Sequence, residues 1–120
     1  MQQDKFKIVN FVKELIVLID KNLVNFPKKE IELKKEIRKC SYELLMLVNE
    51  GNVTSSNERR IELIEKAIAE IKQIDFLINL CADKQIINSK KYFKFGERLD
   101  MIIRYLVGWL KTTKEHYNRA

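Results

Sequence analysis

The apolar residues of this chain recur at helical spacing in four long stretches, which short polar or proline-containing breaks separate. The first stretch covers about residues 4–24, and the others cover about residues 28–50, 56–83 and 89–116. In each of them apolar side chains return every three or four residues, the period of a helix that buries one face. Four long helices with short connections predict an all-α protein, an antiparallel up-down four-helix bundle in a single domain spanning residues 1–120.

The first stretch carries more apolar surface than one buried face needs. We predict that its core-facing stripe consists of Phe6, Val9, Val12, Ile16, Ile19 and Leu23. Leu15 and Leu18 fall outside that stripe. Because a helix of a monomeric bundle needs an apolar face only about 100° wide, we predict that Leu15 and Leu18 pack against another subunit.

Local signals mark the helix ends. Asp4 is a suitable first N-cap, and the Phe26-Pro27 pair ends the first helix and begins the second. Gly51 is expected to stop the second helix, since glycine adopts the left-handed conformation of a C-terminal cap without strain. The spacing of Ser55 and Glu58 predicts a capping box near the start of the third helix, and Asn88-Ser89 should cap the fourth.

Composition agrees with this class and adds a charge imbalance. The chain has 120 residues, only three glycines and one proline, and a net charge of +6. Residues 88–120 hold eight basic and three acidic side chains, whereas the remainder is nearly neutral. No bounded apolar leader or run long enough to span a bilayer is present, so we expect a cytoplasmic protein with no membrane partner. Cys40 and Cys81 lie in apolar stretches and read as small buried residues.

The sequence offers no catalytic constellation. His116, the single histidine, has no nucleophile at a suitable spacing, and a histidine near a helix C-terminus commonly complements the helix dipole. The chain contains neither the Glu-x-x-His pairs of metal-binding bundles nor a glycine-rich phosphate loop. We therefore predict a protein that is not an enzyme and that uses no cofactor or metal.

Basic side chains are the remaining candidates for a binding site. Arg59 and Arg60 occupy the first turn of the third helix, where they oppose the helix dipole. On rigid helices such cations can contact phosphates without reading sequence, although a solvated helix surface has the same pattern. The candidate nucleic-acid or partner contacts are Lys34, Lys35, Arg38, Lys39, Arg59, Arg60, Lys91, Lys94, Arg98, Arg104 and Lys111.

Gly108 is unusual because it stands inside the fourth helix beside Trp109. A glycine at such a position costs about 1 kcal/mol relative to alanine. We predict that Gly108 and Trp109 belong to a packing or assembly contact, in which the missing side chain lets a backbone or a bulky group approach. A tolerated defect is the alternative.

Two segments carry a family resemblance. Phe26 to Glu30 followed by Ile37-Arg38 resembles the opening of the second helix in the four-helix-bundle proteins encoded by intervening sequences of bacterial ribosomal RNA genes. Lys91-Tyr92, Arg98 to Asp100, Arg104 and Gly108 to Lys111 resemble the accessory variability determinants of diversity-generating retroelements. At positions 103 and 107, where those proteins commonly have glycine, this chain has Ile103 and Val107.

The resemblance implies a function that composition does not show. It implies a non-catalytic accessory protein that forms a homo-oligomer, a pentameric ring, and that binds a reverse transcriptase and RNA or DNA during mutagenic copying. The alternative within the same resemblance is a scaffold of the ribosomal intervening-sequence type, which has no direct role with nucleic acid.

Overall fold

The predicted fold class is confirmed. The computed structural model describes residues 2–119, with side chains from residue 6 onward. This described part consists of α1 (Gln2–Asn22), a short 3₁₀ helix η1 (Lys28–Glu30), α2 (Ile31–Val53), α3 (Asn57–Asp83) and α4 (Ser89–Arg119).

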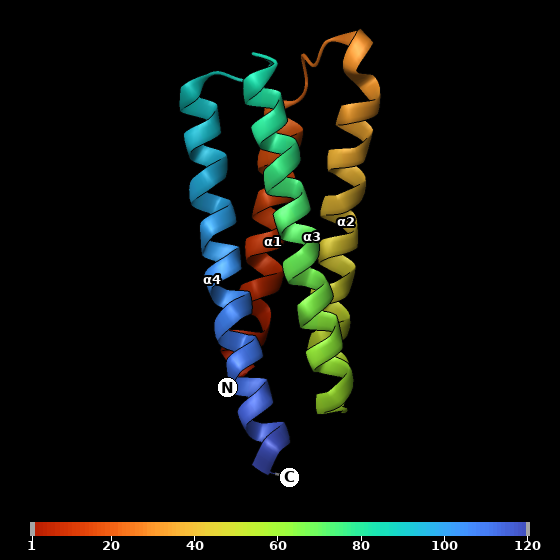
Figure 1. Cartoon of the computed structure of the whole chain (residues 1–120), viewed down its shortest axis with the longest axis vertical. Helices are drawn as coiled ribbons and strands as arrows, with labels where there is room; N and C mark the ends of the chain where they lie inside the picture. Colours follow the sequence, from red (N-terminus) through yellow and green to blue (C-terminus); the bar gives the residue numbers. More distant parts are fainter. Residues whose placement is uncertain (1, 120) are drawn as a thin grey trace.

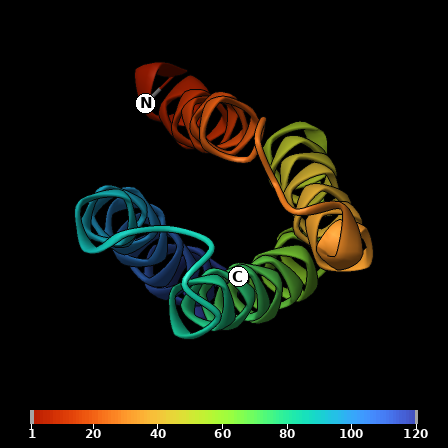
Figure 2. The same ribbon diagram turned by 90° about the horizontal axis from the view of Figure 1, so that it is seen from above.

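The α-helices run up and down around one core (Figure 1). Seen along the bundle, α1, α2, α3 and α4 follow one another in chain order (Figure 2). Successive helices pack together, and α1 also packs along α4, which closes a bundle of 51 × 23 × 21 Å. We call the end that holds the α1–α2 and α3–α4 connections the upper end. The lower end holds the α2–α3 connection, the beginning of α1 and the end of α4.

The core is a continuous apolar column in which Phe95 is the largest fully buried side chain. Ser41 and Thr113 are the buried polar side chains of the described part, and each donates its hydroxyl to a carbonyl of its own helix. Hydrogen bonding within the helix removes the cost of burying a hydroxyl. In the part of the chain that the structure describes, no helix combines the length and the hydropathy that crossing a bilayer requires.

The buried face of α1 differs from the predicted stripe. Val12, Ile19 and Leu23 are buried as predicted, but Ile8 and Leu15 complete the face, and Phe6 is exposed. Leu15 is fully buried within the protomer, so the prediction that it contacts another subunit is wrong. Residues 15–19 are all apolar, so their pattern alone could not fix the angle of the face. Leu18 is half-buried and packs against the core, as a flank of that face.

Helix starts are partly as predicted. Asn88 caps α4, because its Oδ1 accepts a hydrogen bond from the Lys91 backbone N–H at 2.9 Å. Ser56 caps α3 by accepting from the Arg59 N–H at 3.1 Å. Glu58 is therefore at the second helical position, one residue too early for the predicted capping box. The first helix already begins at Gln2, so Asp4 lies inside it, and the side chain of Asp4 is outside the described ones.

Two helix ends also differ from the prediction. α1 ends at Asn22, whose Nδ2 donates to the Leu18 carbonyl. α2 does not stop at Gly51 but continues to Val53. Gly51 has an ordinary helical conformation and is buried, so its role is packing and not termination. Gln85, with φ of 60°, takes the left-handed position at the end of α3 instead of a glycine.

Candidate functional site

Arg60 holds the α2–α3 connection together. Its Nε donates to the Gly51 carbonyl at 2.9 Å, one Nη donates to Asn57 Oδ1, and the other donates to the Thr54 carbonyl. These bonds satisfy carbonyl groups at the C-terminus of α2, which its own helix leaves free. They explain why an arginine stands against the dipole of α3, and they give Arg60 an anchoring role.

Arg59 bridges the same two helices at the surface. Its guanidinium lies 2.9 Å from Glu50 on α2 and 3.2 Å from Glu62 on α3. The Glu50 hydrogen bond is the main reason that the pKa of Arg59 is raised. Arg59 and Arg60 were both predicted as phosphate contacts, but the structure engages both within the protomer.

Two arginines of α4 are also paired. Arg98 contacts Glu14 of α1, and Arg104 contacts Asp100 one turn earlier at 2.9 Å. Both pairs are open to solvent, where an ion pair contributes only about 0–1 kcal/mol. Such partners can be exchanged for a phosphate at little cost.

Most of the candidate lysines remain unpaired. Lys35 has a long contact of 3.8 Å with Glu32, and both side chains are exposed. The others form no ion pair with any carboxylate of the described residues. This unpaired set is Lys34, Lys39, Lys91, Lys94 and Lys111.

The α4 cations do not form one continuous stripe. Lys91, Lys94 and Arg98 lie within about 60° of one another at 100° per residue, but Arg104 and Lys111 lie about 120° further round the helix. The first three are on the side that faces α1, because Arg98 meets Glu14 there. Arg104 and Lys111 are on the outer side, so the predicted continuation is wrong.

α1 adds a cation that the sequence did not single out. Lys21 follows Glu14 by seven residues, so it lies two turns higher on the same side of α1. Because α4 runs antiparallel, Lys91 is two turns higher than Arg98 and reaches a similar level. We call Lys21, Lys91, Lys94 and Arg98 the seam cations; Glu14 and the neighbouring Glu97 are the carboxylates beside them.

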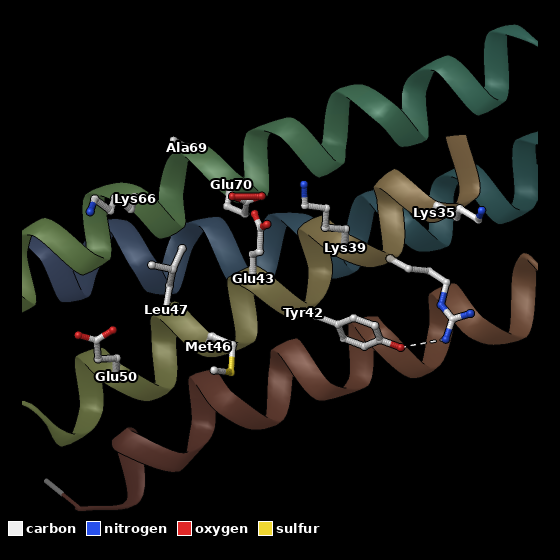
Figure 3. Close-up of a pocket in the computed structure, with 11 residues that line it drawn as sticks. Lys35, Lys39, Tyr42, Glu43, Met46, Leu47, Glu50, Lys66, Ala69 and Glu70 are labelled. Carbon is white, nitrogen blue, oxygen red and sulfur yellow. Dashed lines mark hydrogen bonds between the residues drawn. The ribbon is translucent and has the colours of Figure 1, made fainter. Parts of the chain in front are cut away.

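A second feature is an open groove of about 920 Å³ on the outer side of α2 and α3 (Figure 3). Tyr42, Met46, Leu47 and Ala69 give it an apolar surface. Met46 is 71% exposed, which is high for a large apolar side chain. An exposed apolar strip rimmed by charges is typical of a protein-binding surface.

The charges of this α2–α3 groove are divided along its length. Lys35, Arg38 and Lys39 come from the upper part of α2. Glu43 and Glu70 approach each other near the middle of the groove (Figure 3). Burial raises the pKa of Glu70, and the charge of Glu43 raises it further. A partner helix with an apolar residue over Met46 and a basic residue over the two glutamates would complement this pattern.

The close-packing glycine is Gly51 and not Gly108. A Cβ on Gly51 would stand 2.9 Å from the Trp109 ring, whereas a Cβ on Gly108 would meet nothing within 4 Å. Trp109 is half-buried and also makes an edge contact with Tyr105 at 6.2 Å. Trp109 therefore packs inside the protomer, and Gly108 is exposed at its surface.

The two cysteine thiols are buried. Burial raises the pKa of the Cys40 thiol to about 12 and that of Cys81 to about 11, so neither forms a thiolate at neutral pH. Among the described residues, no group of three or more His, Cys, Asp or Glu side chains is placed to hold a metal ion.

The basic residues of α4 stand out in the sequence, whereas Lys21 and the α2–α3 groove do not. The signal for the groove was present, since Tyr42 and Met46 are four residues apart on the polar side of α2. Comparisons with protein-family models, with curated proteins and with solved structures find no match to this chain.

Proposed function

We propose that this protein is a non-catalytic accessory protein that binds nucleic acid along the α1–α4 seam. The observation that carries the proposal is the state of the seam cations. Lys21, Lys91 and Lys94 form no ion pair within the described part of the chain, and Arg98 is held only by an exposed carboxylate. Cations that stabilise nothing in the protomer are available to an anionic partner.

A polyanion fits the seam cations better than a single small anion does. Lys91, Lys94 and Arg98 extend over about 10 Å of α4 at 1.5 Å per residue, and Lys21 lies beside them on α1. Several phosphates can be met at once, each with the release of counterions. Side chains that contact only phosphates do not read bases, so we expect binding without sequence preference.

The retroelement role extends this proposal to particular partners. Its support is the resemblance of residues 91–111 to the accessory variability determinants. In this role the seam binds the RNA or DNA of the element, the α2–α3 groove holds the reverse transcriptase, and the protein assembles as a pentamer.

The second candidate is a scaffold of the ribosomal intervening-sequence type. The observation that favours it is the α2–α3 groove, whose apolar surface suits a protein helix. In that case the seam cations are a solvated surface and only the groove is functional.

The test is binding of a labelled oligonucleotide, measured by fluorescence anisotropy at several salt concentrations. The variant Lys91→Glu/Lys94→Glu should weaken binding strongly. If both lysines contact phosphate, the slope of the logarithm of the binding constant against the logarithm of the salt concentration should become shallower by about 1.4–1.8. The matched control is Lys29→Glu/Lys72→Glu, which changes two exposed lysines, one on η1 and one on the outer side of α3.

Equal weakening by both variants would show a non-specific charge effect. No binding by the unaltered protein at low salt would remove the nucleic-acid function and leave the scaffold.

A further inference from the structure

The lower end of the bundle contains a second pocket, of about 750 Å³, which lies outside both the seam and the α2–α3 groove. It is lined from all four helices, with Lys7 from α1, Asn52 from α2, Arg60 from α3 and Trp109 from α4 among its residues. This volume is in the range of small-molecule sites, about 300–1,000 Å³. We call it the lower-end pocket.

The pocket is formed by parts that the fold holds in place. Trp109 is wedged against Gly51, where a side chain would clash with its ring. Arg60 is fixed by its bonds to the Gly51 and Thr54 carbonyls and to Asn57. The walls are thus preorganised, which lowers the entropy cost of binding a ligand.

The charge of the lower-end pocket is of one sign. Lys7, Arg60 and Arg104 line it together with His116, and none of its described lining residues is acidic. Arg60 is anchored and supplies fixed charge. Lys7 and Arg104 are exposed, and the partner of Arg104 is a solvent-exposed Asp100. Both side chains are therefore able to turn to a bound anion.

The pocket also offers aromatic surface and neutral polar groups. Tyr105 and Trp109 line it side by side, and Asn52 and Thr112 contribute an amide and a hydroxyl. Aromatic rings next to cations suit a ligand that has both a flat ring and a phosphate, because stacking and charge pairing act at opposite ends of it.

We propose that the lower-end pocket binds a nucleoside phosphate, with the base against Trp109 and the phosphate between Lys7 and Arg104. The unit can come from a free nucleotide or from an end of single-stranded nucleic acid. Binding of a strand end rests on the proposed function, whereas binding of a free nucleotide does not.

Trp109 is the single tryptophan of the chain, so its fluorescence reports on this pocket. The experiment titrates the full chain with adenosine 5′-monophosphate, and separately with an oligothymidylate, while excitation near the red edge of the tryptophan band avoids absorption by the base. Lys7→Gln/Arg104→Gln should raise the ligand concentration needed for half-maximal quenching of Trp109 by about tenfold or more. The control Lys91→Gln/Lys94→Gln alters the seam at the upper end and should leave the nucleotide titration unchanged.

Quenching by the mononucleotide that depends on Lys7 and Arg104 supports the pocket with a free nucleotide as its ligand. Quenching by the oligothymidylate alone, with the same dependence, supports it with a strand end. The proposal is overturned if neither probe quenches Trp109, or if quenching is insensitive to the Lys7/Arg104 variant. It is also overturned if inorganic phosphate competes as well as the mononucleotide does, because the base would then contribute nothing. Because oligonucleotide binding to the seam is measured separately, its absence in the unaltered protein together with intact mononucleotide quenching would reject the proposed function and keep the pocket.

Discussion

At the scale of single residues, two glycines inside helices have opposite surroundings. Gly51→Ala places a Cβ 2.9 Å from the Trp109 ring, and we expect a loss of about 1–3 kcal/mol in the free energy of unfolding. Gly108→Ala meets open space and should gain about 0.5–1 kcal/mol, since alanine favours the helix. Chemical denaturation of both variants measures the contrast. Equal effects of the two substitutions would mean that Trp109 does not rest on Gly51.

Glu70 gives a residue-level prediction that depends on pH. Burial raises its pKa in the folded protein, so its charge opposes folding at neutral pH. The opposition disappears when pH falls below the ordinary glutamate pKa of about 4.3, where both states are protonated. Glu70→Gln should therefore raise the melting temperature at pH 7 and lose that advantage near pH 4.

The control is Glu115→Gln, which changes an exposed glutamate near the end of α4. It should have little effect at either pH. An advantage of Glu70→Gln that persists unchanged at acidic pH would show that its cause is packing and not charge.

At the scale of elements, the α2–α3 connection depends on one arginine more than on its neighbour. Arg60→Gln removes bonds to two backbone carbonyls and to Asn57, and we expect it to cost about 1–3 kcal/mol because those acceptors lose their donors. Arg59→Gln removes only exposed ion pairs and should cost about 0–1 kcal/mol. Thermal unfolding compares the two. A larger loss at Arg59 would contradict the anchoring role of Arg60.

Sequence periodicity predicted the four helices but not the details that depend on neighbours. The start of α4 was predictable because the Asn88 cap is a local interaction. The angle of the α1 face was not predictable, because the packing of the neighbouring helices determines that Ile8 and Leu15 are buried and Phe6 is exposed. Gly51 was misassigned because a glycine that stops a helix and one that admits Trp109 look alike in sequence. Arg59 and Arg60 were predicted as ligand contacts because the sequence does not reveal their partners within the protomer. Those partners, Glu50 and Gly51, are nine residues earlier, across the α2–α3 turn.

At the scale of the whole molecule, the proposed sites are separated. The seam cations occupy the upper part of the α1–α4 side, the groove runs along α2 and α3, and the nucleoside-phosphate pocket opens at the lower end. This leaves the outer side of α1 free for contacts between copies. A nucleic acid on the seam and a protein helix in the groove could thus be bound by one protomer at the same time.

The outer side of α1 is the surface on which we expect self-association. Phe6 and Val17 are 66% and 52% exposed, and their spacing places them within about 20° of one line along α1. Val24, which follows the end of α1, is 69% exposed. These residues take the place of Leu15 as the expected contact with another subunit, because the side chain of Leu15 is buried in the core. A stripe of exposed large apolar residues is costly in water and is typical of an interface.

Light scattering on a sizing column measures the consequence. The proposed pentamer predicts a mass near five times the 14.3 kDa of one chain. Phe6→Glu/Val17→Glu should reduce this mass toward that of a single protomer, because charges on the stripe would have to be buried unpaired. The matched control Phe76→Glu changes an equally exposed phenylalanine on α3 and should leave the mass unchanged. A protomer mass for the unaltered protein would reject assembly altogether, whereas an oligomer that survives the double substitution would move the interface to another face of the bundle.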